Sequence, residues 1–413
     1  MLRYVALWNR WLAWDDRAWR EDDTLAVYDR IRAHVRAATA SDKDWLKATI
    51  IASVERLAKS DRRYAATADQ WDRHDWLLNT PTGIADLATG QVHDSDPDAH
   101  LTKLTGFGPS GDCPTWRRFL DQVAGGDADY VAFLQRVAGY AATGSIREHA
   151  LFFLYGSGAN GKGTFLNTLQ KVLGDYATVS SMETFTESKV DRHTTELAML
   201  RGARLVLAQE TEEGRAWAES RIKALTGGDP VTARYMRQDN FTFYPKFKLL
   251  IAGNHKPRLR NVDEAMRRRL HLLPFVVTFR GENRDPDLAD KLLAEGPGIM
   301  RWIVEGALAY QAEGLNPPEV VTNATADYFA GENMLQEWLA ERCDLGPDYW
   351  EPSSRLFESW KHFAERANEK TGTKKTLGER LEAAGFRGGN TASRGGRHWQ
   401  GLRLKSEPFG QEA

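Results

Sequence analysis

The feature that most constrains this sequence is a glycine-rich stretch between an apolar run and an amphipathic one. HALFFLYG (149–156) has the length and composition of a buried strand, and TFLNTLQKVLG (164–174) has the apolar spacing of a helix. Between them, GSGANGKG fits the pattern G-x-x-x-x-G-K, which ends at Lys162. This strand-to-helix context predicts a phosphate-binding loop, because it places the loop at the N-terminus of a helix. A glycine-rich turn without a ligand is the alternative.

The predicted loop supplies the groups that bind phosphate. Its glycines let backbone N–H groups turn inward, the helix N-terminus adds a partial positive charge, and Lys162 adds a full one. The residues expected to bind the nucleotide are Gly156, Gly158, Asn160, Gly161, Lys162, Gly163, Thr164 and Phe165. A hydroxyl residue usually follows the lysine as a magnesium ligand. Here Gly163 takes that position, so Thr164 is the expected ligand, directly or through water.

Two later apolar runs end in polar residues that fit the same site. ARLVLAQE (203–210) ends in Glu210, and a carboxylate at the end of a buried strand is unfavourable unless it serves a site. Glu210 is expected to bind magnesium and to polarise the attacking water, although Gln209 replaces the first of the two acids that are frequent at such strand ends. FKLLIAGN (247–254) ends in Asn254, which is expected to orient the water through its amide.

Three consecutive arginines, 267–269, precede the apolar run LHLLPFVVTF (270–279). In ring-shaped motors an arginine of one subunit reaches the neighbouring subunit's nucleotide and stabilises charge on the γ-phosphate. The position of these arginines, after the acid and the asparagine, favours such a finger. An ordinary solvated basic run is the alternative.

A β-hairpin is predicted between the acid and the asparagine. VTARYM and FTFYP (231–236 and 241–245) indicate two strands, with RQDN between them as the turn. Basic and aromatic residues gather on or near this hairpin, Phe241 and Lys248 among them. Those predicted to contact single-stranded DNA are Lys223, Arg234, Tyr235, Arg237 and Lys246. Repeated around a ring, they would hold one strand without sequence preference. A hairpin that only packs domains together is the alternative.

Both ends of the chain have patterns of their own. Residues 1 to about 75 have the apolar spacing of helices, while 76–92 indicates short strands and tight turns. A run of closely spaced tryptophans is predicted to share one helix face: Trp8, Trp11, Trp14 and Trp19. From about 331, two helices, a third short one and a basic β-wing are predicted, and Arg394 and Arg397 of the wing are expected to contact DNA. A basic cap that mediates protein contacts is the alternative.

Composition narrows the class of protein. The net charge of −2 excludes a uniformly basic nucleic-acid coat, so DNA-binding groups must be concentrated locally or multiplied by oligomerisation. No apolar run is long enough to span a bilayer, and no secretory signal pattern opens the chain. Cys113 and Cys343 lie far apart and have no metal-site spacing. We expect a soluble, cytoplasmic protein with no membrane partner.

Taken together, these stretches resemble the superfamily 3 helicases, in particular the phage/plasmid and poxvirus-type primase–helicases. The matching segments occur in the family's order: GSGANGKGTF, GARLVLAQETEEG, IKALTGGDPVTARYMRQDNFTF, KLLIAGNHKPRL and DEAMRRRLHLLPF. The resemblance implies an α/β fold with an AAA+-type P-loop NTPase core and a parallel sheet at 141–325. It also implies a mainly helical N-terminal domain at 1–140 and a winged-helix-like DNA-binding tail at 331–413.

The resemblance further implies an ATP-dependent DNA helicase of phage or plasmid replication. Such a protein would use ATP or another NTP with Mg²⁺, form a homo-oligomeric ring, expected to be a hexamer, and translocate 3′ to 5′ on single-stranded and forked DNA. Family loops contain N-G-K-S-T or N-G-K-G-T, so Gly163 is a family variant. The family's arginine pair maps to Arg268 and Arg269, with Arg268 as the expected finger. The chain begins at what resembles the linker after a primase domain, so a separate primase or origin-binding protein is an expected partner.

Two other functions stay open at this point. Gly163 and Gln209 leave few protein ligands for magnesium, which would slow turnover. That would suit an ATP-switched DNA-binding replication initiator or regulator with little unwinding. The other alternative is an AAA+ ATPase that acts on protein, although the basic hairpin and the basic tail argue against it.

Overall fold

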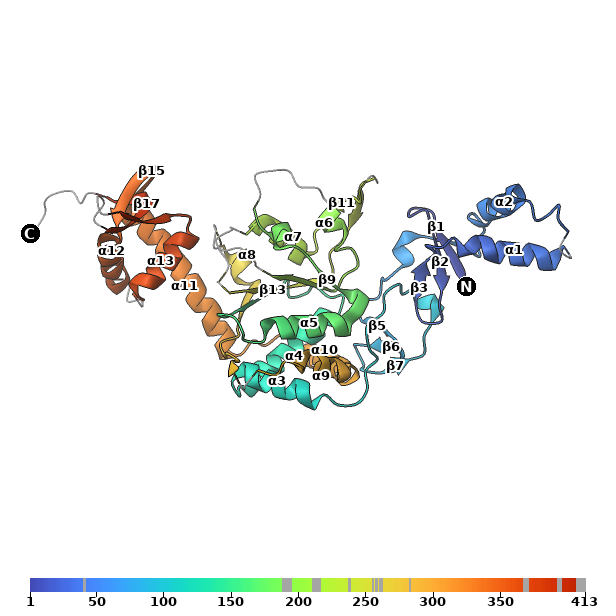
Figure 1. The fold of residues 1–413 in the computed structure, drawn as a ribbon, viewed down its shortest axis with the longest axis horizontal. Coiled ribbons are helices and arrows are strands. Elements are labelled where there is room, and N and C mark those ends of the chain that lie inside the picture. The colour runs from blue at the N-terminus through green and yellow to red at the C-terminus, as the bar shows by residue number, and fades with distance from the viewer. Residues whose placement is uncertain are drawn as a thin grey trace, which may run out of the picture.

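The computed structural model describes most of the chain. The residues it leaves out are 40–41, 188–194, 210–216, 237–238, 255, 257–258, 260–262, 282–283, 367–370, 392–395 and 406–413, and only the backbone is described at 331–333, 383 and 391. The predictions for Glu210, Arg237 and Arg394 therefore fall outside the described residues. In Figure 1 an N-terminal unit, a central core and a C-terminal unit follow one another along the long axis of the molecule.

The central core is built on a five-stranded sheet in the order β14-β8-β13-β10-β9. Its strands are β8 (Leu151–Tyr155), β9 (Ala177–Val179), β10 (Leu205–Gln209), β13 (Lys248–Gly253) and β14 (Leu270–Pro274). All neighbouring strands of this sheet are parallel. The parallel sheet predicted from the apolar runs is therefore confirmed. β9, which has no long apolar run, was not predicted.

β8 shows why these strands are apolar throughout. Phe152 and Leu154 pack into a hydrophobic cluster on one face, and Leu151 and Phe153 pack into a second cluster on the other. A parallel strand covered on both faces has this continuous apolar pattern. The first cluster includes residues of α3 (Pro114–Ala124), α4 (Ala128–Ala142), α5 (Lys162–Leu173), α9 (Leu288–Ala294) and α10 (Gly296–Glu313). The second includes residues of α6 (Thr195–Ala198), α7 (Glu219–Gly227) and α8 (Glu264–Arg267), on the opposite side of the sheet (Figure 1).

The predicted domain boundary at residue 140 runs through this core. α3 and α4 precede that boundary, yet they pack into the same hydrophobic cluster as the sheet. Trp116 of α3 stacks against Phe165 of α5, with ring centroids 5.7 Å apart. α4 lies so close to α10 that a Cβ on Gly139 would lie 2.1 Å from the carbonyl carbon of Gly306. The structure thus assigns both helices to the core.

The N-terminal unit opens on strands, so the helical face predicted for the tryptophans is wrong. A sheet in the order β3-β2-β1-β4 consists of β1 (Leu2–Val5), β2 (Arg10–Trp14), β3 (Trp19–Glu21) and β4 (Ala65–Ala66). Trp14 pairs with Trp19 across a tight turn, with ring centroids 5.7 Å apart. Asn9 and Asp16, with φ angles of 51° and 74°, lie in the two turns. Aromatic residues pack well on a pleated surface, and Asn and Asp favour such turns, which explains the strands.

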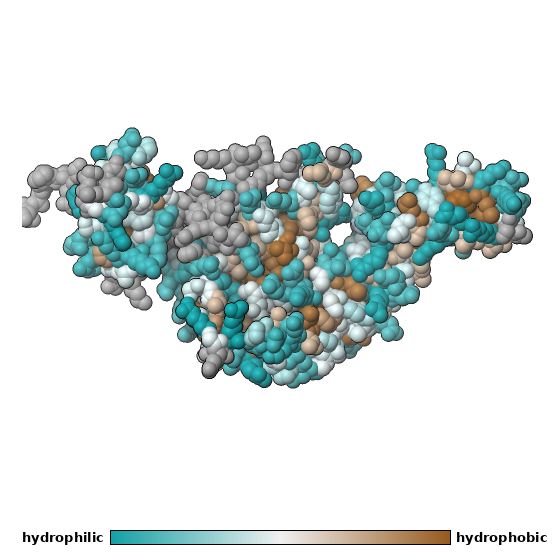
Figure 2. Space-filling view, viewed as in Figure 1, coloured by the Kyte–Doolittle hydropathy of each residue, from teal (hydrophilic) through white to brown (hydrophobic). Residues whose placement is uncertain are grey.

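Helices and short strands complete the N-terminal unit. α1 (Ala26–Ala38) and α2 (Ala48–Ala58) confirm that this region contains helices. An antiparallel sheet of β5 (Leu77–Thr80), β6 (Gly83–Asp86) and β7 (Val92–His93) confirms the strands and turns predicted at 76–92. Single 3₁₀ turns occur at η1 (Ala68–Gln70) and η2 (Pro97–Ala99) in this unit, and at η3 (Gly174–Tyr176) and η4 (Met182–Phe185) in the central core. Figure 2 shows a hydrophobic area at the α1–α2 end of the molecule, and Val54 and Leu57 of α2 are exposed.

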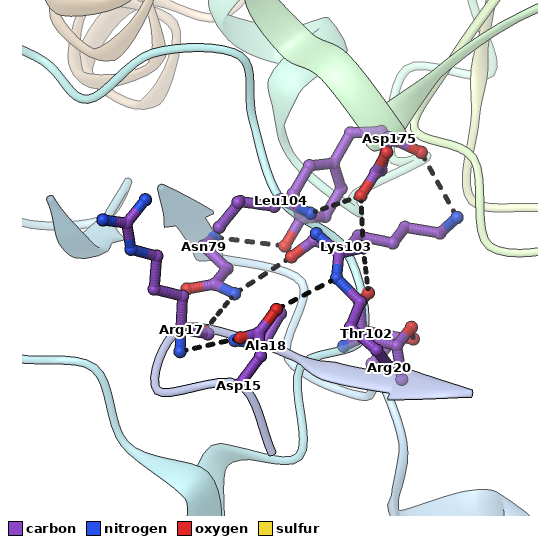
Figure 3. A network of polar contacts seen from close by, with 11 residues as sticks. Asp15, Arg17, Ala18, Arg20, Asn79, Thr102, Lys103, Leu104 and Asp175 are labelled. Atoms are coloured by element: carbon purple, nitrogen blue, oxygen red, sulfur yellow. Dashed lines mark hydrogen bonds and ion pairs between the residues drawn. The ribbon is translucent and has the colours of Figure 1, made fainter. Parts of the chain in front are cut away.

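A polar network joins the N-terminal unit to the core (Figure 3). Asp175 follows α5, and its carboxylate accepts a hydrogen bond from Arg20 Nη1 at 2.8 Å. Asn79 Nδ2 donates to the carbonyl oxygens of Arg17 at 2.8 Å and Lys103 at 3.0 Å. The N-terminal unit is thereby held against the C-terminal end of α5, the helix that follows the predicted phosphate-binding loop.

Two cations are buried in the core, and one of them, Arg204, also binds the N-terminal unit. Arg204 donates to the carbonyl oxygens of Ala142 and Leu77 at 2.8 and 2.7 Å, and Lys248 donates to the carbonyl oxygen of Thr143. Burial lowers the pKa of both cations. Because Lys248 is only 1% exposed, its inclusion in the basic DNA-binding surface is wrong, and its ammonium group instead binds the chain just before β8.

The C-terminal unit has a hydrophobic cluster of its own. The long helix α11 (Glu319–Arg342) leads into it, followed by β15 (Cys343–Pro352), α12 (Ser353–Arg366), α13 (Lys374–Ala383), β16 (Arg387–Thr391) and β17 (Gly396–Leu404). The strands form an antiparallel sheet in the order β15-β17-β16. The helices and the β-wing predicted for the tail are present, whereas β15 was not predicted. Among the described helices, none combines the length and apolarity needed to cross a membrane.

Candidate nucleotide site

The glycine-rich loop connects the end of β8 to the start of α5, as the sequence predicts. β8 ends at Tyr155, and α5 begins at Lys162. Gly158 and Gly161 have φ angles of 97° and 85°, which are strained for any residue with a side chain. Gly161 is also the N-cap of α5, so the loop ends where the helix N–H groups are unpaired.

Gly156 and Asn160 fix the shape of the loop. A Cβ on Gly156 would lie 2.0 Å from the carbonyl oxygen of Phe275 and 2.1 Å from Asn160 Nδ2, so only glycine fits there. Asn160 Nδ2 donates to the Phe275 carbonyl oxygen at 2.7 Å. Asn160 is 3% exposed, and its amide therefore ties the loop to the chain that follows β14.

Lys162 joins the loop to the neighbouring strand. Its ammonium group donates to the Gly156 carbonyl oxygen at 2.6 Å, to Asn160 Oδ1 at 3.1 Å and to Asn254 Oδ1 at 3.4 Å. Asn254 directly follows β13, which pairs with β8 in parallel, so the sheet brings together two predicted residues that lie 92 positions apart. Burial lowers the pKa of Lys162. The Lys162 ammonium group therefore lies inside the loop, and among the described residues its hydrogen-bond partners are all oxygen atoms.

The next three residues have different surroundings. A Cβ on Gly163 would meet no atom within 4 Å, and Thr164 is partly exposed beside it. The Phe165 ring is fully buried against Trp116 and Phe275, and its N–H donates to the Gly161 carbonyl oxygen at 2.9 Å. The nucleotide-binding role predicted for Phe165 does not fit these contacts, because both the side chain and the N–H are engaged inside the protein.

Substitutions at Gly163 and Gly161 are expected to have opposite outcomes. Gly163→Ser should retain ATP hydrolysis within about threefold of the wild-type rate or raise it, because its side chain meets open space and supplies the usual hydroxyl ligand. Gly161→Ala should lower nucleotide binding by about tenfold or more, because φ is 85° and the new Cβ would lie 3.0 Å from Phe119 and Val123. Nucleotide titration and steady-state hydrolysis check both variants. Loss of binding in Gly163→Ser, or none in Gly161→Ala, would contradict this description of the loop.

The predicted metal ligands are only partly described. β10 ends at Gln209, and Glu210 lies outside the described residues. Within the described part of the chain, no group of three or more His, Cys, Asp or Glu side chains could hold a metal ion. Magnesium binding by Thr164 and Glu210 therefore stays a prediction.

The three arginines before β14 have three distinct environments. Arg267 lies over the Phe329 ring, with its guanidinium carbon 5.1 Å from the ring centroid. Arg269 is 7% exposed, and its Nη1 donates to the Ala265 carbonyl oxygen at 2.9 Å. Arg268, between them, is exposed. Arg268 is thus the arginine of the three whose position suits contact with another molecule.

The arginines lie at the opposite edge of the sheet from the loop. Leu270 at the start of β14 pairs with Leu151 at the start of β8, whereas the loop follows Tyr155 at the other end of β8. Five residues of strand separate the two edges by roughly 16 Å. An arginine side chain cannot span this distance, so Arg268 does not reach the glycine-rich loop of its own chain.

The predicted hairpin is present, and it consists of β11 (Val231–Ala233) and β12 (Phe241–Phe243). Arg234 is exposed on it, whereas the Tyr235 hydroxyl donates to the Ala198 carbonyl oxygen at 3.2 Å. Arg237 lies outside the described residues. Tyr235 also stacks against Phe241 at a centroid distance of 5.3 Å, so its ring supports the hairpin from one side.

Two of the basic residues predicted to contact DNA are already paired. Lys246 forms an ion pair with Asp75 at 2.6 Å, which links the base of the hairpin to the N-terminal unit. Lys223 lies on α7 rather than on the hairpin, and it forms an ion pair with Asp263. Neither pairing is visible in the sequence, because each partner lies at least 40 positions away. These contacts give both lysines structural roles that the sequence did not predict.

Of the two arginines predicted to contact DNA in the tail, Arg397 is exposed on β17, and Arg394 lies outside the described residues.

Lys256 lies at the same edge of the sheet as the glycine-rich loop. Its ammonium group is 5.0 Å from the centre of the Tyr155 ring. Lys256 was not predicted as a site residue. Its position two residues after Asn254 is the signal that could have found it.

Comparison with known proteins gives two family matches. Residues 1–125 match the family described as D5 N terminal like, and residues 154–269 match a family of unknown function (DUF5906). The second match spans the loop, β10, the hairpin and the three arginines. The structure itself shows a mixed α/β protein with a parallel sheet and with helices in its N-terminal region.

Two relatives from large DNA viruses carry provisional helicase names. The chain is 25% identical over 295 residues to helicase L207/L206 of Acanthamoeba polyphaga mimivirus, which covers 65% of this chain and 31% of the relative. It is also 25% identical over 236 residues to helicase 022R of Frog virus 3 (isolate Goorha), covering 52% and 24%. The chain therefore spans less than a third of the length of these relatives. Together with the family matches, they confirm the resemblance to the helicase part of the primase–helicases.

Solved structures of the NrS-1 C-terminal region also match the chain. The A form apo structure of that region gives a TM-score of 0.43 at 12% identity, covering 57% of each chain. A second apo structure, of its residues 305–718, gives a TM-score of 0.42 at 12% identity, covering 56% of this chain and 58% of the other. Likenesses this distant carry no conclusion about function.

Proposed function

We propose that this chain is an ATP-dependent DNA helicase that acts in the replication of a phage, plasmid or DNA virus. The observation that carries the proposal is the contact between Lys162 and Asn254, which joins the phosphate-binding loop to the end of the adjacent strand. A lysine in a glycine loop and a polar residue at the next strand end are two parts of a nucleotide-hydrolysing site. The relatives named as helicases support the same class of function.

The residues of the loop fit the phosphates of ATP or another NTP. Gly156 and Gly161 let the loop lie close against the rest of the core, where a Cβ would meet Phe275 and Phe119, and Lys162 places a cation inside the loop. Bound Mg²⁺–NTP supplies the phosphoanhydride and neutralises part of its charge. Lys162 would exchange the Gly156 carbonyl for phosphate oxygens. Thr164 and Glu210 would hold the metal, Glu210 would polarise the attacking water, and Asn254 would orient that water through its amide.

The site would be completed between subunits of an AAA+-type ring, which we expect to be a hexamer. Arg268 is exposed at the sheet edge opposite the loop, where it can reach only a neighbouring subunit. Its guanidinium group would stabilise the charge that develops on the γ-phosphate. The exposed position of Arg268 supports this oligomer, because a finger at that place would act on the nucleotide of another copy of the chain.

Arginines would supply the DNA contacts. Arg234 is exposed beside β11, and Arg397 is exposed on β17 of the C-terminal unit, which we interpret as a winged-helix-like DNA-binding tail. Arg237 and Arg394 lie outside the described residues and are proposed as DNA contacts from the sequence alone. Contacts of this kind bind phosphate without sequence preference, and their sum around a ring gives affinity that falls with salt. Single-stranded and forked DNA are the proposed substrates. A primase or an origin-binding protein is the proposed partner.

DNA-dependent ATP hydrolysis tests the proposal. At saturating Mg²⁺, single-stranded DNA is expected to raise the hydrolysis rate several-fold, because a motor couples hydrolysis to movement along the strand. A barely measurable rate combined with ATP-dependent assembly on DNA would favour the initiator that uses ATP as a switch. Hydrolysis that does not respond to DNA would favour an ATPase that acts on protein. Either result would overturn the helicase assignment.

A further inference from the structure

The helix before the hairpin and the helix before the finger are in contact. α7 ends at Gly227, four residues before β11, and α8 ends at Arg267, next to Arg268. Both helices pack on the same face of the sheet, where Leu225 and Met266 share one hydrophobic cluster. The hairpin and the proposed finger of one chain therefore each follow one of two helices that are in contact, although they lie far apart in sequence.

An ion pair makes the first link between the two helices. Lys223 of α7 pairs with Asp263, the N-cap residue of α8. The other carboxylate oxygen of Asp263 accepts a hydrogen bond from Met266 N at 2.9 Å. The hydrogen bond from Lys223, followed by that from Met266, lowers the pKa of Asp263. One carboxylate thus holds the start of α8 and binds α7 at the same time.

Arg269 makes the second link, at the other end of α8. A Cβ on Gly227 would lie 3.6 Å from Arg269 Nη2 and 3.9 Å from Asp229 Oδ2, so the guanidinium group lies against the C-terminal end of α7. The negative end of a helix dipole stabilises a cation at this position. Arg269 also donates to the Ala265 carbonyl oxygen of α8. The two helices are therefore connected at both ends of α8.

We propose that α7 and α8 move as one unit that couples Arg268 to the hairpin of the same subunit, with Lys223, Asp263 and Arg269 as positioning residues. The inference rests on the proposed function. It assigns a direction to the coupling: the hairpin that responds to a nucleotide belongs to the subunit that supplies the finger, not to the subunit whose loop binds the nucleotide. It also replaces the predicted DNA contact of Lys223 with a role in communication.

A matched pair of substitutions separates these two roles of Lys223. Lys223→Met keeps the aliphatic stem and removes the charge, while Asp263→Asn keeps an N-cap and removes the same ion pair. Both are expected to lower the stimulation of hydrolysis by single-stranded DNA about fivefold or more, with DNA affinity within about twofold of the wild type. The double variant should resemble either single one, because the two changes delete one shared interaction. Lys291→Met, which breaks the exposed ion pair between Lys291 of α9 and Asp285 before that helix, is the control and should leave stimulation unchanged.

Each outcome decides between the alternatives. Weaker DNA binding in Lys223→Met together with unchanged or tighter binding in Asp263→Asn would make Lys223 a DNA contact and overturn the coupling role. Full stimulation in both variants would overturn it as well, while leaving the helicase assignment intact. A wild-type protein that DNA does not stimulate would overturn both proposals, and that result differs from the others because it does not depend on a variant. Thermal unfolding of each variant, expected to match the wild type closely, excludes a loss of fold as the cause.

Discussion

Replacing Lys162 with alanine is expected to lower ATP hydrolysis by about a hundredfold or more, the size of effect that follows from removing one group aimed at developing charge. The Lys162 ammonium is the cation held inside the loop, within 2.6–3.4 Å of oxygen atoms from Gly156, Asn160 and Asn254. Without it, the β- and γ-phosphates lose their positive partner in a site that is partly shielded from water. Phosphate release under saturating nucleotide measures the rate, and nucleotide titration measures binding.

Lys171→Ala is the matched control for this prediction. Lys171 lies on the same helix, α5, but it is exposed in the last turn and distant from the loop. Its replacement should leave hydrolysis within about twofold of the wild type, as for most exposed substitutions. Equal rates for Lys162→Ala and the wild type would show that the loop is not the hydrolytic site.

Replacing Arg268 with alanine is expected to lower the rate of ATP hydrolysis about a thousandfold. Nucleotide affinity should stay within about threefold of the wild type. The loop proposed to bind the nucleotide is complete without Arg268, because the arginine lies at the other edge of the sheet. In the proposed ring, Arg268 would act only on the charge that develops during phosphoryl transfer in a neighbouring subunit. Arg267→Ala is the control and should have a much smaller effect, because Arg267 packs on Phe329 of its own chain.

Mixing the two inactive variants tests whether the finger acts between subunits. In a random co-assembly of Lys162→Ala and Arg268→Ala chains, about a quarter of the interfaces pair an intact loop with an intact finger. Hydrolysis should therefore return in the mixture although each variant alone is inactive. An inactive mixture from co-expressed, co-assembled chains would contradict the shared site.

The loop and the sheet could be predicted because their signals are local. Runs such as LFFLY are apolar at every position, which indicates a strand buried on both faces, and Phe152 and Phe153 do pack on opposite faces. The glycines of the loop mark backbone conformations that other residues disfavour, and Gly158 and Gly161 have the positive φ angles that this implies. The contact of Lys162 with Asn254 then follows from the parallel pairing of two predicted strands.

The remaining features depend on contacts that sequence spacing does not reveal. The tryptophan pattern fits a helix by its spacing, yet turns at Asn9 and Asp16 fold it into a sheet. The charge of a lysine does not show whether it faces solvent or a distant partner. Lys246 pairs with Asp75, Lys223 pairs with Asp263, and Lys248 is buried among carbonyl groups. A basic run in the sequence therefore overestimates the surface available to DNA.

Strand separation on a forked DNA duplex with ATP and Mg²⁺ is the most direct test of the helicase assignment, with Lys162→Ala and Arg268→Ala as parallel samples. The wild type is expected to separate the strands in an ATP-dependent reaction, and neither variant is expected to do so alone. Wild-type protein that hydrolyses ATP and binds the fork without separating it would contradict the helicase assignment. Separation by either variant at the wild-type rate would contradict the assignment of the site.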